Sequence, residues 1–303
     1  MGLFVASMTH AQEIKPALEV SLPPLEYRTV EFDRTSQQII TTADKTTIII
    51  LDASTGKRMV ELKATEEVFN ARFMRDPSKV MSAGREGFLV WDLEAGKSRT
   101  ISDKTHTRCN QSPMGQYVAS SHTLGAIVWD ATTWEVACPE AGASNGWVAD
   151  AVIMPDGQTI ATASQRSSGI RIDSIETGEP VKLLPGKEST FYTIAPDAHG
   201  RWLAATSKGL VQVWDVPSGQ LAYTLEDRNE YVASINSTRP WLATATTDNI
   251  IEISNVATQA ILFRLVGHQG KPLSAQFDPT GNQVVSCDDQ GRILVWKLID
   301  QEN

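Results

Sequence analysis

Histidines and cysteines are the residues of this chain that could most readily bind a metal ion or act in acid–base or nucleophilic catalysis. The five histidines are His10, His106, His122, His199 and His268. None is two or four positions from another, so no pair has the spacing of a metal site. The three cysteines are Cys109, Cys138 and Cys287, and they form no CxxC pair. We therefore expect no metal and no cofactor, and we interpret the cysteines as free core residues.

Carboxylates are abundant, but they recur with a period. A short apolar run precedes each of Asp52, Asp92, Asp130, Asp173 and Asp215. A catalytic pair of carboxylates is needed once, whereas a residue that recurs with a repeat usually serves the scaffold. The chain also lacks the glycine-rich phosphate-binding motifs and the HExxH zinc motif. We predict no catalytic residues and no enzymatic activity.

The apolar runs that carry these carboxylates set the organisation of the chain. Seven runs end at positions 52, 92, 130, 173, 215, 255 and 297, with steps of 40, 38, 43, 42, 40 and 42 residues. Each repeat reads as four short strands joined by Pro-, Asp- or Gly-containing turns, and no segment has a helical period. A period near forty is typical of a propeller blade. We predict an all-β, seven-bladed β-propeller of four-stranded antiparallel blades that fills residues 17–303 as one domain.

One strand is left over at the beginning of the propeller, and one is missing at its end. Residues 18–22 alternate apolar and polar side chains ahead of the first complete repeat, whereas the last repeat ends after its third strand. We expect the N-terminal strand to complete the last blade and close the ring. Residues 1–16 are interpreted as a flexible tail or the remnant of an export signal, because residues 2–6 are apolar and residues 9–11 resemble a cleavage site.

The last repeat resembles the WD40 repeat family. It opens with Leu-Val-Gly-His at residues 265–268, turns at Asp-Pro-Thr-Gly in residues 278–281 and ends its third strand at Trp296. Earlier repeats keep the Trp-Asp ending at positions 91–92, 129–130 and 214–215. The resemblance covers residues 17–298, and it implies the same seven-bladed propeller.

In that family a histidine, a serine, an aspartate and a tryptophan form a buried hydrogen-bonded network within a blade. By resemblance, these structural roles belong to His268, Ser286, Asp289 and Trp296, and the tryptophans of other blades are Trp91, Trp129 and Trp214. A buried tryptophan brings a large apolar area and an N–H that needs an acceptor. Gln290 departs from the pattern, because the family usually has aspartate six residues before the tryptophan.

The resemblance also implies a function. WD40-like propellers usually bind partners at the rim where the fourth strand of one blade runs into the first strand of the next. The candidate partner-binding residues of that rim are Glu67, His106, Trp147, Glu188, Glu230, Tyr231 and Lys271. We expect a non-catalytic protein-interaction scaffold with Trp147 and Tyr231 as exposed aromatic anchors. The alternatives are that each aromatic packs beneath its own loop, or that the chain is an extracytoplasmic propeller enzyme or small-molecule binder that uses the central channel.

Composition limits the partner and the location. A net charge of -9 and a pI near 5.1 disfavour nucleic acid, whose phosphates attract Lys and Arg. No apolar run reaches the roughly 20 residues of a membrane helix, so we expect no membrane insertion. We predict a monomeric propeller that is periplasmic or secreted, with the cytoplasm as the alternative. A domain of a larger sensor is less favoured, because only a few residues follow the last expected strand.

Overall fold

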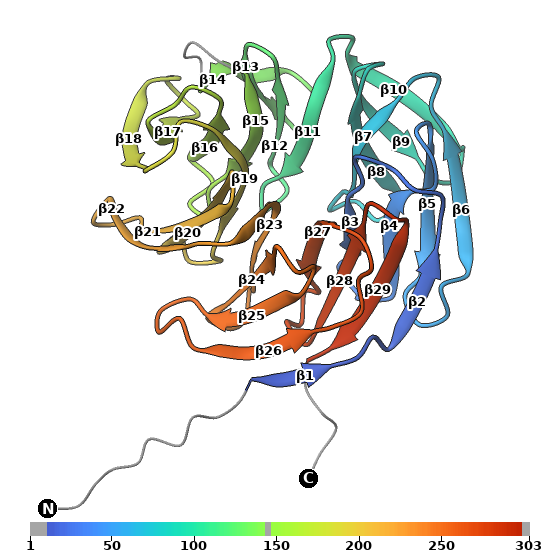
Figure 1. Cartoon of the computed structure of the whole chain (residues 1–303). Coiled ribbons are helices and arrows are strands. Elements are labelled where there is room, and N and C mark those ends of the chain that lie inside the picture. The colour runs from blue at the N-terminus through green and yellow to red at the C-terminus, as the bar shows by residue number, and fades with distance from the viewer. Residues whose placement is uncertain (1–10, 143–146, 299–303) are drawn as a thin grey trace, which may run out of the picture.

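The computed structural model describes residues 11–142 and 147–298 of the chain. In this part every element is a β-strand, and the strands form seven small sheets arranged in a ring (Figure 1). The sequence-based prediction of an all-β, seven-bladed propeller is therefore confirmed. The segment interpreted as part of an export signal, residues 1–10, lies outside the described residues.

Each blade is built from consecutive antiparallel strands with the first strand innermost, and blades six and seven each add an N-terminal strand. Blade one contains β3 (Val30–Phe32), β4 (Gln38–Thr42), β5 (Thr47–Asp52) and β6 (Arg58–Lys63). Blade two contains β7 (Val68–Phe73), β8 (Lys79–Gly84), β9 (Phe88–Asp92) and β10 (Lys97–Ser102). Blade three contains β11 (His106–Gln111), β12 (Tyr117–His122), β13 (Gly125–Asp130) and β14 (Val136–Ala141).

The remaining blades follow the same plan. Blade four contains β15 (Val148–Ile153), β16 (Thr159–Ser164), β17 (Gly169–Ser174) and β18 (Pro180–Pro185). Blade five contains β19 (Phe191–Pro196), β20 (Trp202–Ser207), β21 (Leu210–Asp215) and β22 (Gln220–Leu225). Blade six contains β23 (Arg228–Ile235), β24 (Trp241–Thr246), β25 (Ile251–Asn255) and β26 (Ile261–Leu265). Blade seven has three strands from this end of the chain: β27 (Pro272–Phe277), β28 (Gln283–Asp288) and β29 (Arg292–Lys297).

The fourth strand of blade seven comes from the N-terminal segment. Strand β2 (Leu18–Ser21) pairs antiparallel with β29, and Leu18 lies opposite Val295. The N–H of Leu22 continues the pairing by donating to the carbonyl of Gly291 at 2.9 Å. The predicted closure of the ring by an N-terminal strand is confirmed, and it covers an edge of β29 that would otherwise be open.

A second N-terminal strand lies within the segment that the sequence analysis interprets as a tail. Strand β1 (Gln12–Ile14) pairs parallel with β26 and makes blade six a five-stranded sheet. Ile14 lies opposite Leu265 and packs against the hydrophobic cluster that contains it. Pro16, which has no N–H for a further ladder bond, lies between β1 and β2. The ordered N-terminal segment therefore contacts blades six and seven in succession.

Apolar contact between blades holds the ring together. One cluster joins Leu51 of blade one to Val285 of blade seven, and another joins Val128 of blade three to Ile153 of blade four. An isolated four-stranded sheet leaves both faces in water, so each blade depends on its neighbours. Full burial of a leucine or valine contributes about 1.5–3 kcal/mol, and many such residues lie between the sheets.

Polar side chains of the first strands also join neighbouring blades. Asn70 in β7 accepts a hydrogen bond of 3.0 Å from the backbone N–H of Cys109 in β11. Asp150 in β15 accepts one of 3.0 Å from the side-chain amide of Asn110 in β11, and one of 3.1 Å from the N–H of Ile194 in β19. These bonds fix the first strands relative to one another, and those strands position the site described next.

Candidate binding site at the channel mouth

An irregularity recurs near the start of the first strand in most blades. In blades two, three, four, five and seven the pairing of the first and second strands slips by one residue, which is a β-bulge. The extra residues are Phe69, Thr107, Ala149, Tyr192 and Leu273. A longer irregularity in blade six includes Tyr231. Bulges re-aim side chains, and all six of these line one cavity.

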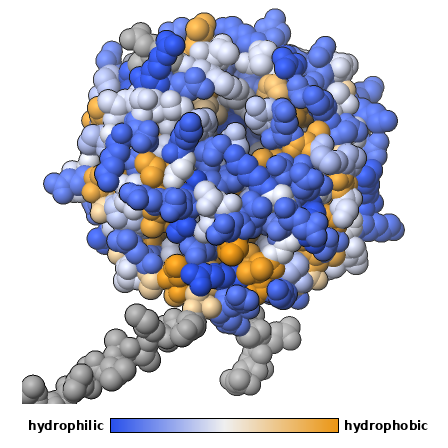
Figure 2. Space-filling model, viewed as in Figure 1, coloured by the Kyte–Doolittle hydropathy of each residue, from blue (hydrophilic) through white to orange (hydrophobic). Residues whose placement is uncertain are grey.

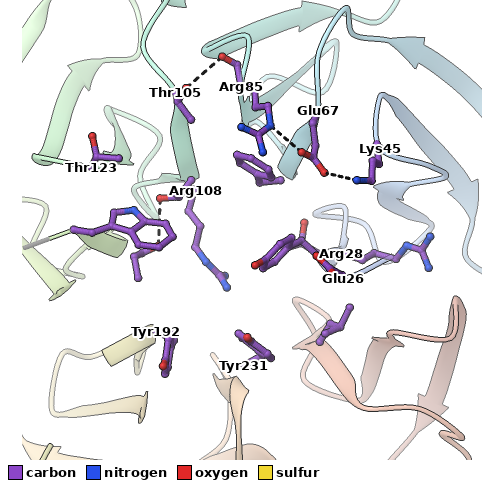
Figure 3. A pocket seen from close by; sticks show the side chains of 17 residues that line it. Glu26, Arg28, Lys45, Glu67, Arg85, Thr105, Arg108, Thr123, Tyr192 and Tyr231 are labelled. Atoms are coloured by element: carbon purple, nitrogen blue, oxygen red, sulfur yellow. Dashed lines mark hydrogen bonds and ion pairs between the residues drawn. The ribbon is translucent and has the colours of Figure 1, made fainter. Parts of the chain in front are cut away.

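We call this space the mouth cavity, because it lies where the first strands of the ring converge (Figure 3). Its volume is about 500 Å³. Five aromatic side chains line it: Tyr27, Phe69, Trp147, Tyr192 and Tyr231. The rings of Tyr192 and Tyr231 meet edge to face at 6.0 Å, and those of Tyr27 and Phe69 at 6.2 Å. Tyr27 is 55% exposed and Trp147 is 41% exposed, so both present apolar area to solvent.

One wall of the mouth cavity carries a cluster of paired charges. Glu67 forms ion pairs with Arg85 at 2.9 Å and with Lys45 at 3.4 Å (Figure 3). The hydrogen bond from Arg85 lowers the pKa of Glu67. The Arg85 guanidinium also lies 5.7 Å from the ring centroid of Phe69, which is a cation–π distance. A third cation, Arg28, is buried and donates hydrogen bonds to backbone carbonyls, including that of Thr42.

Arg108 is the cation of the mouth cavity that lacks such partners. It is half-buried on β11, and its side chain extends into the middle of the opening toward Tyr192 and Tyr231 (Figure 3). Burial raises the pKa of the Tyr231 hydroxyl, and the charge of Arg108 partly opposes that rise. No carboxylate of the described residues lies within ion-pair distance of Arg108. Glu26, a second carboxylate of this cavity, is exposed.

A second cavity of about 480 Å³ adjoins the first and shares Tyr27 and Tyr231 with it. Lys271 lines this second cavity, with its Nζ 2.8 Å from the Glu230 carboxylate and 4.5 Å from the ring centroid of Tyr231. The ion pair and the cation–π contact hold the Tyr231 ring between the two cavities.

The structure brings only part of the predicted rim together. Glu67, Trp147 and Tyr231 line the mouth cavity. Glu230 and Lys271 pair with each other at the second cavity. Glu188 is half-buried and lines neither cavity.

His106 does not belong to a binding surface, which corrects its prediction as a rim residue. Its side chain is fully buried, with Nε2 2.9 Å from the Ser102 hydroxyl. Its ring packs edge to face against Phe88 and His122 at 6.2 and 5.6 Å. The bulge explains the error, because it directs the next residue, Thr107, to the cavity. Burial lowers the pKa of His106 to about 4, and His122 adds to the effect.

Several residues of the mouth cavity were missed from the sequence, among them Tyr27, Phe69, Arg108 and Tyr192. The predicted rim stopped at the loops, whereas these residues lie in or next to the strands. A signal was present in two of them. Phe69 follows Val68, and Tyr192 follows Phe191, so two large apolar residues stand side by side where a half-buried strand would alternate.

The histidine network of blade seven uses Asp288 and not Asp289. His268 Nδ1 lies 3.0 Å from Asp288 Oδ2, and its Nε2 lies 2.7 Å from Ser286 Oγ. The indole N–H of Trp296 donates to the same hydroxyl at 2.8 Å. The assignment of Asp289 is corrected because side chains alternate along a strand, so Ser286 and Asp288 share one face of β28.

The two neighbouring aspartates have different environments. Burial opposes ionisation of Asp288, but the hydrogen bond from His268 and two backbone N–H bonds outweigh it and lower its pKa. Asp289 lies in the turn that follows β28, and it accepts a hydrogen bond of 3.0 Å from the backbone N–H of Lys271.

The indole N–H groups of the tryptophans in other blades donate to two kinds of acceptor. The indole N–H of Trp91 donates to Ser82 Oγ, and that of Trp129 donates to Ser120 Oγ, each at 2.8 Å. Trp214 donates instead to the carbonyl of Pro185 at 2.8 Å. All three side chains are buried, so the tryptophan serves the core of the blades that contain it.

Residues suited to metal or nucleophile chemistry are dispersed over the described part of the chain. No three His, Cys, Asp or Glu side chains in residues 11–142 and 147–298 gather closely enough to hold a metal ion. A GxSxG sequence, the pattern of a nucleophile elbow, occurs at residues 142–146, but its serine, Ser144, lies outside the described residues. That motif requires a strand-to-helix turn, whereas the elements on either side are β14 and β15.

The face of the molecule shown in Figure 2 is mostly hydrophilic, and its hydrophobic residues lie in small separate clusters, some of them toward blades six and seven. Within residues 11–142 and 147–298, no helix is long and apolar enough to cross a membrane.

Comparison with known proteins identifies the repeats. Residues 178–215 and 259–297 match the WD40 family, described as "WD domain, G-beta repeat". The WD repeat-containing protein SL1-17 of Schistosoma mansoni is 27% identical over 195 residues, which cover 63% of this chain and 64% of that protein. The nuclear distribution protein nudF of Aspergillus niger is 21% identical over 239 residues, 69% of this chain and 54% of that protein.

A third relative is the WD repeat and HMG-box DNA-binding protein 1 of Xenopus laevis, 25% identical over 137 residues, 44% of this chain and 12% of that protein. The matches therefore span less than two thirds of the length of each of these relatives.

Proposed function

We propose that this chain, a seven-bladed propeller that carries WD40 repeats, is a non-catalytic scaffold that binds a protein partner at the mouth cavity. The observation that supports this most is the series of bulges that turns Phe69 and Tyr192 into one opening. A strand pairing that served stability alone would keep these two side chains in the core. Exposed aromatics that converge on a concave surface are typical of protein interfaces.

The partner class follows from the lining and from the charge. Interfaces are enriched in Tyr, Trp and Arg, and the mouth cavity has all three in Tyr27, Trp147 and Arg108. The chain has a net charge of -9, which opposes a sequence-independent grip on nucleic acid. A protein partner is therefore proposed for this chain.

A small-molecule binder is the second candidate. The mouth cavity, at about 500 Å³, is within the 300–1,000 Å³ typical of ligand pockets. Lys45 and Arg85 pair with Glu67, whereas Arg108 and Glu26 have no ion-pair partner among the described residues. Protein interfaces are enriched in Tyr, Trp and Arg, and all three line this cavity, which supports the protein-binding proposal.

Affinity capture from an extract of the native organism tests the proposal. Wild-type protein is compared with Trp147→Ser and with Met114→Ser, which removes an exposed apolar side chain from the turn between β11 and β12, at the other end of β11 from the mouth cavity. We expect a protein recovered in about equimolar amount by the wild type and by Met114→Ser, and lost with Trp147→Ser. Equal recovery by all three would place the binding surface elsewhere and contradict the proposal.

A further inference from the structure

In the mouth cavity, the positive charges outnumber the negative charges after the ion pairs within the cavity are discounted. Lys45 and Arg85 share the single carboxylate of Glu67, and Arg28 is turned into the protein, where it donates to carbonyls. Arg108 remains, half-buried and without an ion-pair partner among the described residues. A cation partly withdrawn from water and left without a counter-charge is unfavourable. An anion that enters the opening would relieve this cost.

The surroundings of Arg108 are aromatic. Tyr192 and Tyr231 stand on the wall that its side chain approaches, and Trp147 lines the same cavity (Figure 3). Low-dielectric walls strengthen an ion pair formed between them. Aromatic rings also offer an apolar contact to side chains next to the anion. The opening is therefore complementary to a ligand that is acidic at one point and apolar beside it.

We infer that the partner enters the mouth cavity with a short acidic segment, whose aspartate or glutamate carboxylate pairs with Arg108 while a neighbouring aromatic side chain packs on Tyr192 and Tyr231. This inference rests on the proposed function and specifies the chemistry of its partner. A volume of about 500 Å³ admits a few side chains and excludes a folded domain.

A carboxylate fits this opening better than a phosphate. A guanidinium offers two parallel N–H donors that match one carboxylate. A phosphorylated side chain carries close to two negative charges and is typically bound by a cluster of arginines. Lys45 and Arg85 already contact Glu67, and Arg28 donates to backbone carbonyls, so Arg108 alone offers a free pair of donors, which one carboxylate matches.

Glu26 provides an internal check. Its exposed carboxylate lines the same cavity and has no ion-pair partner among the described residues. It repels an acidic ligand and does not touch the groups that would bind one. Replacing Glu26 with glutamine should therefore strengthen the binding of an acidic ligand. The same replacement should weaken the binding of a basic ligand.

Peptide binding by the full chain tests the inference. Three pools of end-capped pentapeptides, Phe-X-Glu-X-Phe, Phe-X-Gln-X-Phe and Phe-X-phosphoSer-X-Phe with X varied, are measured by fluorescence anisotropy. We expect the Glu pool to bind about tenfold more tightly than the Gln pool, which corresponds to about 1.4 kcal/mol. Arg108→Gln should abolish that difference and Glu26→Gln should increase it. The control Arg99→Gln removes an exposed charge from β10, the outermost strand of blade two, and should preserve the difference.

Several outcomes would overturn the inference. These are equal binding of the Glu and Gln pools, no binding of any pool, or a Glu preference that survives Arg108→Gln. Tighter binding of the phosphoserine pool would assign the anion to a phosphate and reject the carboxylate. Arg108→Lys keeps the charge and loses the paired donors. This variant should retain part of the preference for the Glu pool, which would show that Arg108→Gln does not act by unfolding the protein. The capture experiment separates the two proposals: a partner lost with Trp147→Ser but fully retained by Arg108→Gln leaves the proposed function standing and removes this inference.

Discussion

The carboxylate of Asp150 in blade four lies 3.0 Å from the side-chain amide nitrogen of Asn110 in blade three. Its other oxygen accepts the backbone N–H of Ile194 in blade five at 3.1 Å, so one buried charge joins three consecutive blades. A carboxylate withdrawn from water is costly unless its oxygens accept hydrogen bonds, and here both do. The first strands that carry the mouth cavity are thus fixed by polar links as well as by apolar contact.

Asp150→Asn should destabilise the ring by about 2–3 kcal/mol, because one carboxamide N–H₂ would then face a hydrogen-bond donor in the buried site. Urea unfolding measures the change. Asp103→Asn, which alters an exposed aspartate between β10 and β11, is the control and should stay within about 0.5 kcal/mol of the wild type. Similar stabilities for the two variants would show that Asp150 does not link the blades.

Adjacent aspartates in blade seven should differ in the same assay. Asp288→Asn keeps one acceptor oxygen, whereas Asp288 uses two, one toward His268 and one toward the N–H of Arg292. The –NH₂ group then faces a donor in the buried network, which should cost about 2–3 kcal/mol of unfolding free energy. Asp289→Asn keeps a side-chain oxygen for the N–H of Lys271 and should cost less than about 1 kcal/mol. The reverse order would restore the sequence-based assignment of Asp289 to the network.

Two N-terminal truncations separate the roles of β1 and β2. Removal of residues 1–16 takes away β1 and the contact of Ile14 with blade six, and should lower Tm by about 3 °C. Removal of residues 1–22 also opens the edge of β29 and exposes the cluster on which Leu18 and Val20 pack, and should lower Tm by about 10 °C or more. Calorimetry decides, and equal Tm values for both truncations would show that β2 is not needed to close the ring.

Acid should weaken blade three through His106. The pKa of this buried imidazole is lowered to about 4, below its usual value of about 6.5 in an unfolded chain. Between these values the unfolded state binds the extra proton, so stability is complete above about pH 6.5 and falls as the pH drops toward about 4. The full loss is on the order of 3 kcal/mol.

His106→Gln should remove this part of the pH dependence, whereas His199→Gln, which replaces an exposed histidine, should keep the wild-type profile. Chemical unfolding between pH 7 and pH 4 provides the comparison. A pH profile that is the same with and without His106 would mean that its protonation is not linked to folding.

The sequence determines the architecture strongly because the repeat is long and regular. The apolar runs that end at positions 52 and 297 are six repeats apart, and each repeat is about forty residues long. Each predicted blade is present. Closure of the ring could be predicted from residues 18–22. This strand precedes the first complete repeat, and the last repeat lacks its fourth strand, so the two can form one blade.

Details that depend on strand register could not be predicted from the sequence. The mouth cavity is made by an offset of one residue between two strands, which decides that Thr107 and not His106 faces the opening. Such an offset leaves no mark in the spacing of the repeats. The parallel pairing of β1 was hidden for a similar reason, since three residues are too few to show a pattern.

The pairing of Leu18 with Val295 also bears on how the ring is made during synthesis. The ribosome produces β2 near the beginning of the propeller, but its partner β29 is among the last strands to emerge. At roughly 5–20 residues per second, β2 waits on the order of half a minute with its hydrogen-bonding groups unpaired. Blades one to six can stack in order as they appear, whereas the seventh can form only when both ends of the propeller meet. Completion of the ring is therefore a late, long-range event, and a chain interrupted before β29 exposes two unsatisfied edges at once.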